Sequence, residues 1–468
     1  MRISRPLAAA FLALATTTTT QANVGETYGF GSRAAALAST GVAGATGAYA
    51  SYYNPAALPA AAGVIGTTDG DHRLAFDLGL VYMTPSFLPI SNVVITNSYT
   101  SGANTTGSVD TSYRETLGEA LGMSYRLLDG SSQLTAGLTA FLPVNQVAFM
   151  DTGDAYAPEY VLYRARTQRP QVEFAVGGRL SERWSLGVGM HLAFALTSNA
   201  SVFLQTAQTN QPSTMRFIAS MKSKFSPYVG ARFAPTGEPE RLALGAVVRL
   251  PATSDNTMVL KSAAHVGFPQ AIDFSFVANS ALFYDPLTVE LGGAWEHAPG
   301  WRLHLQADYQ AWSAYQAPAL SIVSCTDATT DPNCGVVVHN SANPGFSYRN
   351  IVIPRVAEEV TSGNWVFRAG YAWRPSFMEN LPTGAGNYLD PPKHMIQAGV
   401  GRLFPRFLGS SIPARIDANL SYHALVTQRV DKSAGDEAGN ASGSKIGAPG
   451  YDAGGKILGG GVSLSLAI

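Results

Sequence analysis

Strict alternation of apolar residues with small or polar ones is the feature of this sequence that most constrains its fold. The run WRLHLQADYQ at residues 301–310 is the clearest example. Because successive side chains of a β-strand point to opposite faces, a period of two predicts strands. We distinguish about fourteen such runs, at residues 74–82, 117–127, 134–142, 172–180, 184–196, 225–233, 242–250, 287–295, 301–309, 351–361, 365–371, 395–404, 416–424 and 456–468.

The connections between these runs alternate in length. They are short after every even-numbered run and much longer after every odd-numbered one. This is typical of bacterial outer-membrane barrels, which have short periplasmic turns and long extracellular loops. Closing the sheet also removes the unpaired edges that a bilayer does not tolerate. The sequence therefore predicts an all-β fold, a transmembrane antiparallel up-and-down β-barrel of about 14 strands, in the outer membrane of a Gram-negative bacterium with both termini periplasmic.

Composition separates this prediction from other classes. Charged residues make up 13% of the chain, against about 25% in ordinary soluble domains. The net charge of -1 gives no basic surface for nucleic acid. No stretch after the N-terminus approaches the ~18 apolar residues of a membrane-spanning helix. The alternative is a water-soluble sandwich or barrel, which the low charge and the aromatic residues near strand ends disfavour; Trp184, Trp301 and Trp365 fit an interfacial girdle.

The N-terminal region divides into a signal and a separate segment. Residues 1–22 combine Arg2 and Arg5, a short apolar run and small residues before a cleavage site after Ala22, which predicts a secretory signal peptide rather than an anchor helix. Residues 23–73 do not alternate and are rich in Ala and Gly. We expect them to form a plug inside the lumen of the barrel at residues 74–468. A disordered periplasmic tail is the alternative.

The two cysteines, Cys325 and Cys334, lie close together in a polar stretch. In an oxidising compartment this spacing predicts a disulfide, with two free thiols as the alternative. No cluster of His and Cys accompanies the pair, so we expect no metal site and no cofactor.

The ordered set of features resembles a known family. The opening GSRAAALASTGVAGATGAYASYYNPAAL, followed by the fourteen-strand pattern, is similar to the FadL/TodX family of outer-membrane transporters for long-chain fatty acids and other hydrophobic compounds. The stretches at residues 303–316, 364–382 and 388–404 also resemble the barrel of that family. The resemblance implies that the segment is a hatch whose motif Asn54, Pro55 and Ala56 caps the lumen. It further implies capture by extracellular loops, passage through the plugged barrel and lateral exit at a kink in the third strand, for which Gly137 is the candidate because glycine weakens strand pairing.

From these observations we expect passive uptake of long-chain fatty acids or other hydrophobic small molecules by a monomer. The surrounding partners would be outer-membrane lipid and lipopolysaccharide. Apolar residues in the predicted loops after the third and seventh strands are candidates to line the substrate path: Phe141, Leu142, Val147, Phe149, Tyr160, Phe274, Phe276 and Phe283.

Three other functions compete with uptake. An outer-membrane enzyme is disfavoured because the sequence contains no H-E-x-x-H or G-x-S-x-G motif. A general diffusion porin would lack the N-terminal segment and would conduct ions. A structural or adhesive barrel would leave uptake unchanged when it is removed.

Overall fold

The structure is a computed structural model of the chain. It describes residues 28–61, 73–97, 105–113, 115–128, 133–144, 158–160, 162–163, 170–205, 214–238, 241–265, 272–315, 321–324, 337–340, 347–379, 387–432, 444–446 and 448–468. The predicted signal peptide, the predicted disulfide between Cys325 and Cys334, and the candidate lining residues Val147 and Phe149 lie outside the described residues and stay predictions.

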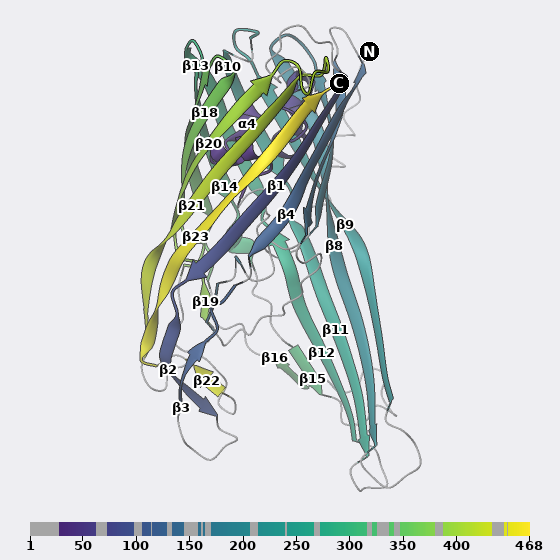
Figure 1. Cartoon of the computed structure of the whole chain (residues 1–468). Coiled ribbons are helices and arrows are strands. Elements are labelled where there is room, and N and C mark those ends of the chain that lie inside the picture. Colours follow the sequence, from purple (N-terminus) through teal and green to yellow (C-terminus); the bar gives the residue numbers. More distant parts are fainter. Residues whose placement is uncertain are drawn as a thin grey trace.

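Fourteen strands close into one antiparallel barrel, as the sequence predicts (Figure 1). They follow one another around the wall in chain order, and β8 pairs with both β7 and β9. The last strand pairs with the first from Ala75 to Phe87, which completes the ring. The barrel strands are β1 (Leu74–Phe87), β4 (Thr116–Leu128), β5 (Leu134–Pro143), β7 (Gln171–Arg179), β8 (Trp184–Gln205), β9 (Thr214–Phe233), β10 (Leu242–Arg249), β13 (Thr288–Ala298), β14 (Trp301–Gln310), β17 (Ile351–Ser362), β18 (Trp365–Arg374), β20 (Lys393–Phe404), β21 (Ala414–Asp431) and β23 (Gly450–Ala467).

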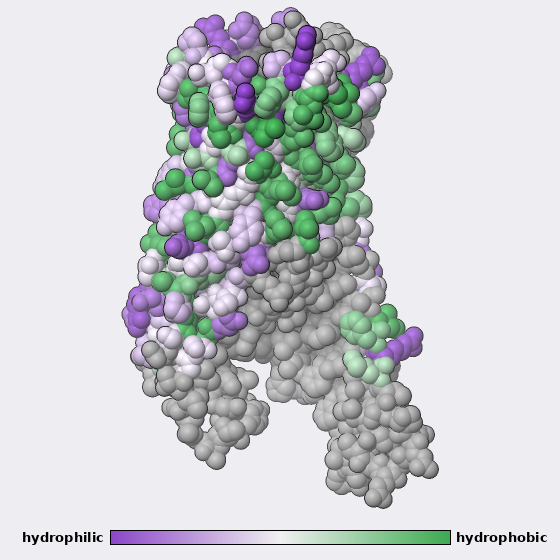
Figure 2. Space-filling model, viewed as in Figure 1, coloured by the Kyte–Doolittle hydropathy of each residue, from purple (hydrophilic) through white to green (hydrophobic). Residues whose placement is uncertain are grey.

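Side chains alternate between the two faces of this wall. In β18, Trp365, Phe367 and Tyr371 are exposed on the outside, whereas Arg368 is buried on the inside. Figure 2 shows hydrophobic side chains gathered on the outer face over β1 and β4. An apolar exterior of this kind is what a bilayer requires, so the barrel spans the outer membrane. None of the helices that the structure describes is both long and apolar enough to cross a membrane.

The two ends of the barrel differ in the way the sequence predicts. Tight turns connect the strands at the end where Leu74 and Ala467 lie, such as Pro299–Gly300 between β13 and β14. This end is therefore periplasmic. The opposite, extracellular end carries additional short strands: β2 (Ile90–Asn97), β3 (Thr105–Val109), β6 (Pro158–Tyr160), β15 (Ser321–Ser324), β16 (Val337–Asn340), β19 (Asn387–Leu389) and β22 (Ser444–Ile446).

Part of the predicted loop after the seventh strand is also sheet. β11 (Ala252–His265) and β12 (Ile272–Asp285) form a hairpin, and β11 runs parallel to the outer part of β8. Pro251 and Pro286 separate this hairpin from β10 and β13, where a missing N–H interrupts the ladder. The sequence pattern does not predict these strands. They lie beyond the bilayer, where no face of the sheet contacts lipid, so their residues need not alternate between apolar and polar.

Residues 28–61, here called the N-terminal segment, lie inside the barrel (Figure 1). The segment consists of short helical turns, which are α3 (Ser32–Ala36), α4 (Gly41–Gly44), α5 (Ala50–Tyr53), η1 (Pro55–Ala57) and α6 (Leu58–Ala61). A further short turn, η2 (Trp312–Ala314), follows β14. The N-terminal segment contacts the wall on several sides: α3 meets β20 and β21, α4 meets β10 and β13, and α5 meets β5 and β7. The lumen is thus filled at this level.

Candidate functional site

The Asn54–Pro55 turn is seated on a patch of glycines in the barrel wall. A Cβ atom at Gly177 would overlap the carbonyl oxygen of Pro55, and one at Gly230 would overlap the side chain of Asn54. Asn54 itself is fully buried; its Nδ2 donates to the carbonyl oxygens of Val42 at 2.7 Å and Ala231 at 3.1 Å. The motif therefore lies directly against β7, β8 and β9, and the small residues on the lumenal face of these strands provide its space.

Gly177→Ala should loosen the N-terminal segment, whereas Gly178→Ala should not. The added methyl group at Gly177 meets backbone that cannot move without displacing the turn, while the nearest atom to a Cβ at Gly178 is Leu134 Cδ1 at 3.5 Å. We expect Gly177→Ala to destabilise the packed segment by about 1–3 kcal/mol, the usual cost of overpacking. Limited proteolysis of residues 28–61 in detergent-solubilised protein measures this. If the segment were equally resistant to proteolysis in both variants, the close contact between Pro55 and Gly177 would be contradicted.

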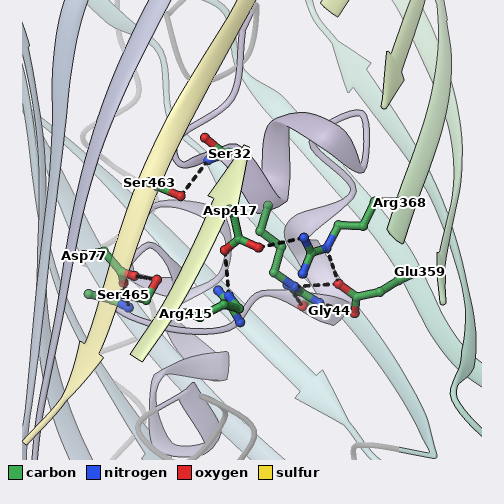
Figure 3. Close-up of polar contacts among 11 residues, drawn as sticks. Ser32, Gly44, Asp77, Glu359, Arg368, Arg415, Asp417, Ser463 and Ser465 are labelled. Atoms are coloured by element: carbon green, nitrogen blue, oxygen red, sulfur yellow. Dashed lines mark hydrogen bonds and ion pairs between the residues drawn. The ribbon is translucent and has the colours of Figure 1, made fainter. Parts of the chain in front are cut away.

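Arg33 is the only charged residue of the N-terminal segment, and it pairs with Glu359 of the wall. Figure 3 shows how Glu359, Arg368, Asp417 and Arg415 continue this chain of ion pairs along the wall. The Nη2 and Nε atoms of Arg33 lie 2.8 and 2.9 Å from the two carboxylate oxygens of Glu359. Arg368 donates to the same Glu359 at 2.6 Å and to Asp417 at 2.7 Å. Asp417 also accepts from Arg415 at 2.6 Å. The segment is thus linked to β17, β18 and β21 through alternating charges.

Other wall side chains bind the backbone of the segment. Arg355 donates to the carbonyl oxygen of Ala38 at 2.8 Å, and Gln306 accepts from the amide of Val42 at 3.1 Å. Asp77 accepts from the amide of Ala48 at 2.6 Å and from the hydroxyl of Ser465. Helices of four or five residues leave most of their terminal amides and carbonyls without intrahelical partners. The polar lumenal wall supplies those partners.

On the extracellular side of the segment, the lumen is apolar and aromatic. Phe30 of the segment packs edge-on against Tyr52 at 4.5 Å and against Phe141 of β5 at 6.3 Å between ring centroids. Near the extracellular strand ends, Phe87 stacks on Tyr160 at 4.1 Å. These residues belong to one connected cluster of buried apolar side chains, here called the apolar column, which also includes Met83, Tyr163, Tyr284, Trp312, Tyr315, Phe377 and Met395.

Two cationic side chains are buried in the apolar column. Lys393 is 1% exposed; its Nζ donates to the hydroxyl of Tyr163 at 2.9 Å and lies 5.1 Å from the centre of that ring. Arg374 pairs with both carboxylate oxygens of Asp390, at 2.9 and 3.0 Å. Lys393 thus places its ammonium group against the hydroxyl and the ring of Tyr163, inside the barrel.

The interior cavities described here are small. One lies between the segment and the wall beside Arg33 and has a volume of about 20 Å³, and another beside His191 and Arg249 has about 40 Å³. A cavity of this size holds one or a few water molecules. Both cavities are too small for a hydrophobic solute, so neither is a path past the N-terminal segment. Within the described parts of the chain, no group of three or more His, Cys, Asp and Glu side chains is placed to hold a metal ion.

The predicted lining residues divide into three groups. Phe141 and Tyr160 are buried in the apolar column, although Tyr160 comes from β6 rather than from an open loop. Leu142 is 40% exposed on the outer face of β5, because a strand alternates its side chains, and it does not line the lumen. The third group lies on β12, where the structure describes the backbone but not these side chains: Phe274, Phe276 and Phe283.

Strand pairing is unbroken at Gly137, the candidate kink. β5 pairs with β4 and with β7 on both sides of Gly137 without a shift of register at that residue. A Cβ atom there would lie 2.8 Å from Leu58 Cδ2 and 2.9 Å from Ser51 Cβ of the N-terminal segment. The glycine therefore allows close approach of the segment, which is a second common reason for glycine within a strand.

Sequence reasoning missed several residues of the apolar column, among them Phe87, Lys393 and Trp312. For β1 a signal was present. On the side of β1 that faces the lumen, the residues change from Asp77 and Gly79 to the apolar Val81, Met83 and Phe87 toward the extracellular end of the strand. Apolar residues on both faces of the same strand indicate that the lumen itself is apolar at that level.

Comparison with known proteins supports the fold. No family model and no curated protein matches the chain. Among solved structures, a FadL homologue of Pseudomonas aeruginosa matches with a TM-score of 0.58 and 14% identity, covering 96% of this chain and 99% of that chain. The CymD monoaromatic hydrocarbon channel matches with a TM-score of 0.51 and 12% identity, covering 94% and 97%. The predicted resemblance is confirmed at the level of the fold: the chain is a fourteen-stranded outer-membrane barrel with the same fold as these two solved structures.

Proposed function

We propose that this protein is a passive channel for the uptake of hydrophobic small molecules across the outer membrane. The observation that carries the proposal is the apolar column, which continues from Phe87 and Tyr160 at the extracellular end to Phe30 on the N-terminal segment. A water-filled porin has a polar lumen and offers nothing to such a solute. The two similar structures, described as a FadL homologue and as a monoaromatic hydrocarbon channel, support the same class of function.

In this proposal the N-terminal segment acts as a hatch. The solute leaves the lipopolysaccharide layer, enters the apolar column and moves inward as aromatic side chains shift. The segment must then loosen, because it fills the lumen between β5, β10 and β21. The capping role of Asn54, Pro55 and Ala56, and lateral exit through the wall, remain part of the proposal. The unbroken ladder at Gly137 gives lateral exit no support at that position.

Uptake by cells tests the proposal directly. Cells with and without the protein are given a long-chain alkane, a monoaromatic hydrocarbon and a long-chain fatty acid, and the initial rate of entry is measured for each. We expect the protein to accelerate at least one of them. Equal rates with and without it for every compound would refute the proposal and leave a structural or adhesive role.

Within this class, the buried ammonium group of Lys393 favours amphipathic acids such as fatty acids. A carboxylate can accept hydrogen bonds from Nζ while its chain lies among Phe87, Tyr160 and Met395, which belong to the same cluster of buried side chains. Hydrogen bonds to a charged group contribute more than neutral ones because both partners are strongly polarised.

Lys393→Met should therefore separate acids from neutral compounds. We expect uptake of a long-chain fatty acid to fall about tenfold, the equivalent of one charged hydrogen bond, while uptake of an alkane of equal length does not fall. Lys222→Met, on the exposed outer part of β9, serves as the control and should change neither rate. A parallel loss of alkane uptake would assign Lys393 a structural role instead.

A further inference from the structure

The outer face of the barrel carries an apolar groove of about 900 Å³ that crosses β1, β20, β21 and β23. The groove is deep at Gly460, which has no side chain, and at Ala398, which has only a methyl group. Gly460 pairs with Tyr82 on one side and with Leu420 on the other, and these two side chains are 47% and 74% exposed. The groove therefore runs between projecting side chains on the membrane-facing surface.

Basic side chains lie on the extracellular side of this groove. Lys456 is four residues from Gly460 along β23, or about 13 Å at the usual rise of a strand. Across the wall, Lys456 pairs with Ala424, and Ala424 pairs with His394 of β20. Both basic side chains are exposed on the outer face. They lie two strands apart, about 10 Å, on either side of a small alanine.

His394 is held in a fixed orientation. Its Nδ1 lies 2.9 Å from the hydroxyl of Tyr371, and its ring packs against Trp373 with 4.4 Å between centroids. Among the residues that the structure describes, neither the second ring nitrogen of His394 nor Nζ of Lys456 has a hydrogen-bond partner. Two possible donors thus face the membrane interface at the end of an apolar groove: the ammonium group of Lys456, and the second ring nitrogen of His394 when it carries a hydrogen.

We propose that this groove is a binding site for lipid A, the phosphorylated, acylated anchor of lipopolysaccharide. Two of its acyl chains would lie in the groove on either side of Leu420, one over Gly460 and one over Ala398, and a phosphate would bind Lys456 and His394. The choice of lipid follows from the orientation of the barrel: the donors lie at the extracellular end, where the outer leaflet of a Gram-negative outer membrane consists of lipopolysaccharide. Near a membrane surface, each basic residue attracts an anionic head group appreciably. The proposal is independent of the proposed uptake function.

Native mass spectrometry of the purified full-length barrel with added lipid A tests this site. We expect one lipid A molecule to be retained by the unsubstituted protein. Lys456→Gln should weaken retention about fivefold, the contribution of one cation at a membrane surface. Ala398→Phe should fill the groove and reduce retention to a similar or larger extent.

Each variant has a matched control. Arg402→Gln removes an outward cation at the opposite, periplasmic end of β20, where Arg402 lies over the Trp365 ring. Ala140→Phe adds the same bulk on the outer face of β5. Neither should alter retention of lipid A, and a heat-shift gel establishes that all four variants are folded. Loss in controls and site variants alike would overturn the proposal, as would unchanged retention in both site variants. Equal retention of phosphatidylglycerol by the unsubstituted protein would also refute lipid A as the ligand.

Discussion

Removal of residues 23–61 is expected to turn this barrel into an open pore. In planar bilayers the intact protein should show little conductance, and the deletion variant should show stepwise conductance at least about tenfold larger, as expected when a wide barrel loses its plug. The effect should be large because the N-terminal segment touches opposite sides of the wall, from β5 and β7 to β20 and β21.

The remaining wall should tolerate the deletion. The side chains that now bind the segment, such as Asp77, Gln306 and Arg355, would face water instead, and polar groups lose little when water replaces a protein partner. A heat-shift gel and circular dichroism measure whether the variant is still a barrel. Adding a peptide of residues 23–61 back to the folded variant should lower its conductance again.

The same measurement separates transporter from porin. A general diffusion porin conducts before any deletion, so full conductance of the intact protein would contradict a sealing role of the segment. A folded deletion variant that stays silent would show that the apolar column alone closes the lumen. In that case the segment would position the column rather than seal the barrel.

The barrel could be predicted because the bilayer imposes a simple rule on every strand that crosses it. Every second residue faces lipid and must be apolar, whereas the residues between them face the lumen and can be small or polar. The fourteen membrane-spanning strands therefore appear in the sequence as runs of alternating residues. The rule ends at the membrane surface. The β11–β12 hairpin and the outer halves of β8 and β9 lie beyond the bilayer and show no such alternation, so the sequence pattern does not distinguish them from loops.

The candidate site was only partly predictable for a related reason. Phe141 and Tyr160 were singled out as apolar residues in predicted loops, and both lie in the apolar column. Lys393 could not be recognised, because its burial results from contacts with Tyr163, which is more than two hundred residues away in the chain. Gly137 was interpreted from its own strand alone, whereas its neighbours Ser51 and Leu58 come from the segment inside the barrel.

The second large effect is expected at Arg33, whose substitution by Met should loosen the N-terminal segment. The side chains of Arg33 and Glu359 are 11% and 12% exposed, so water screens the pair little. Breaking a buried pair by removing one partner costs about 3–5 kcal/mol, whereas exposed pairs contribute about 0–1 kcal/mol. Since Glu359 keeps Arg368 as a partner, we expect the lower end of the range, about 3 kcal/mol, or about a hundredfold in the opening equilibrium.

Hydrogen exchange of the segment's amides measures this opening. The amides of Ala35 and Ala45 donate within the segment, at 3.0 and 2.9 Å, and exchange only when it loosens. Met retains the aliphatic part of the Arg33 side chain, so the comparison isolates the charge and the hydrogen bonds, including the one to the Gly44 carbonyl oxygen at 3.1 Å. Arg429→Gln is the matched control, because it removes an exposed Arg–Asp pair in which the side chains are 49% and 82% exposed; exchange should not change.

A double substitution shows whether the pair itself is responsible. Glu359→Gln alone leaves Arg33 buried without its carboxylate, so it should loosen the segment at least as much as Arg33→Met. Combined with Arg33→Met, it should cost less than the sum of the two single changes, because no unpaired charge remains on the segment and Arg368 still binds Asp417 at 2.7 Å. Strictly additive effects, or unchanged exchange in Arg33→Met, would contradict this role of the ion pair. The segment would then be held by the hydrogen bonds that Arg355 donates to the Ala38 carbonyl and that Gln306 accepts from the Val42 amide.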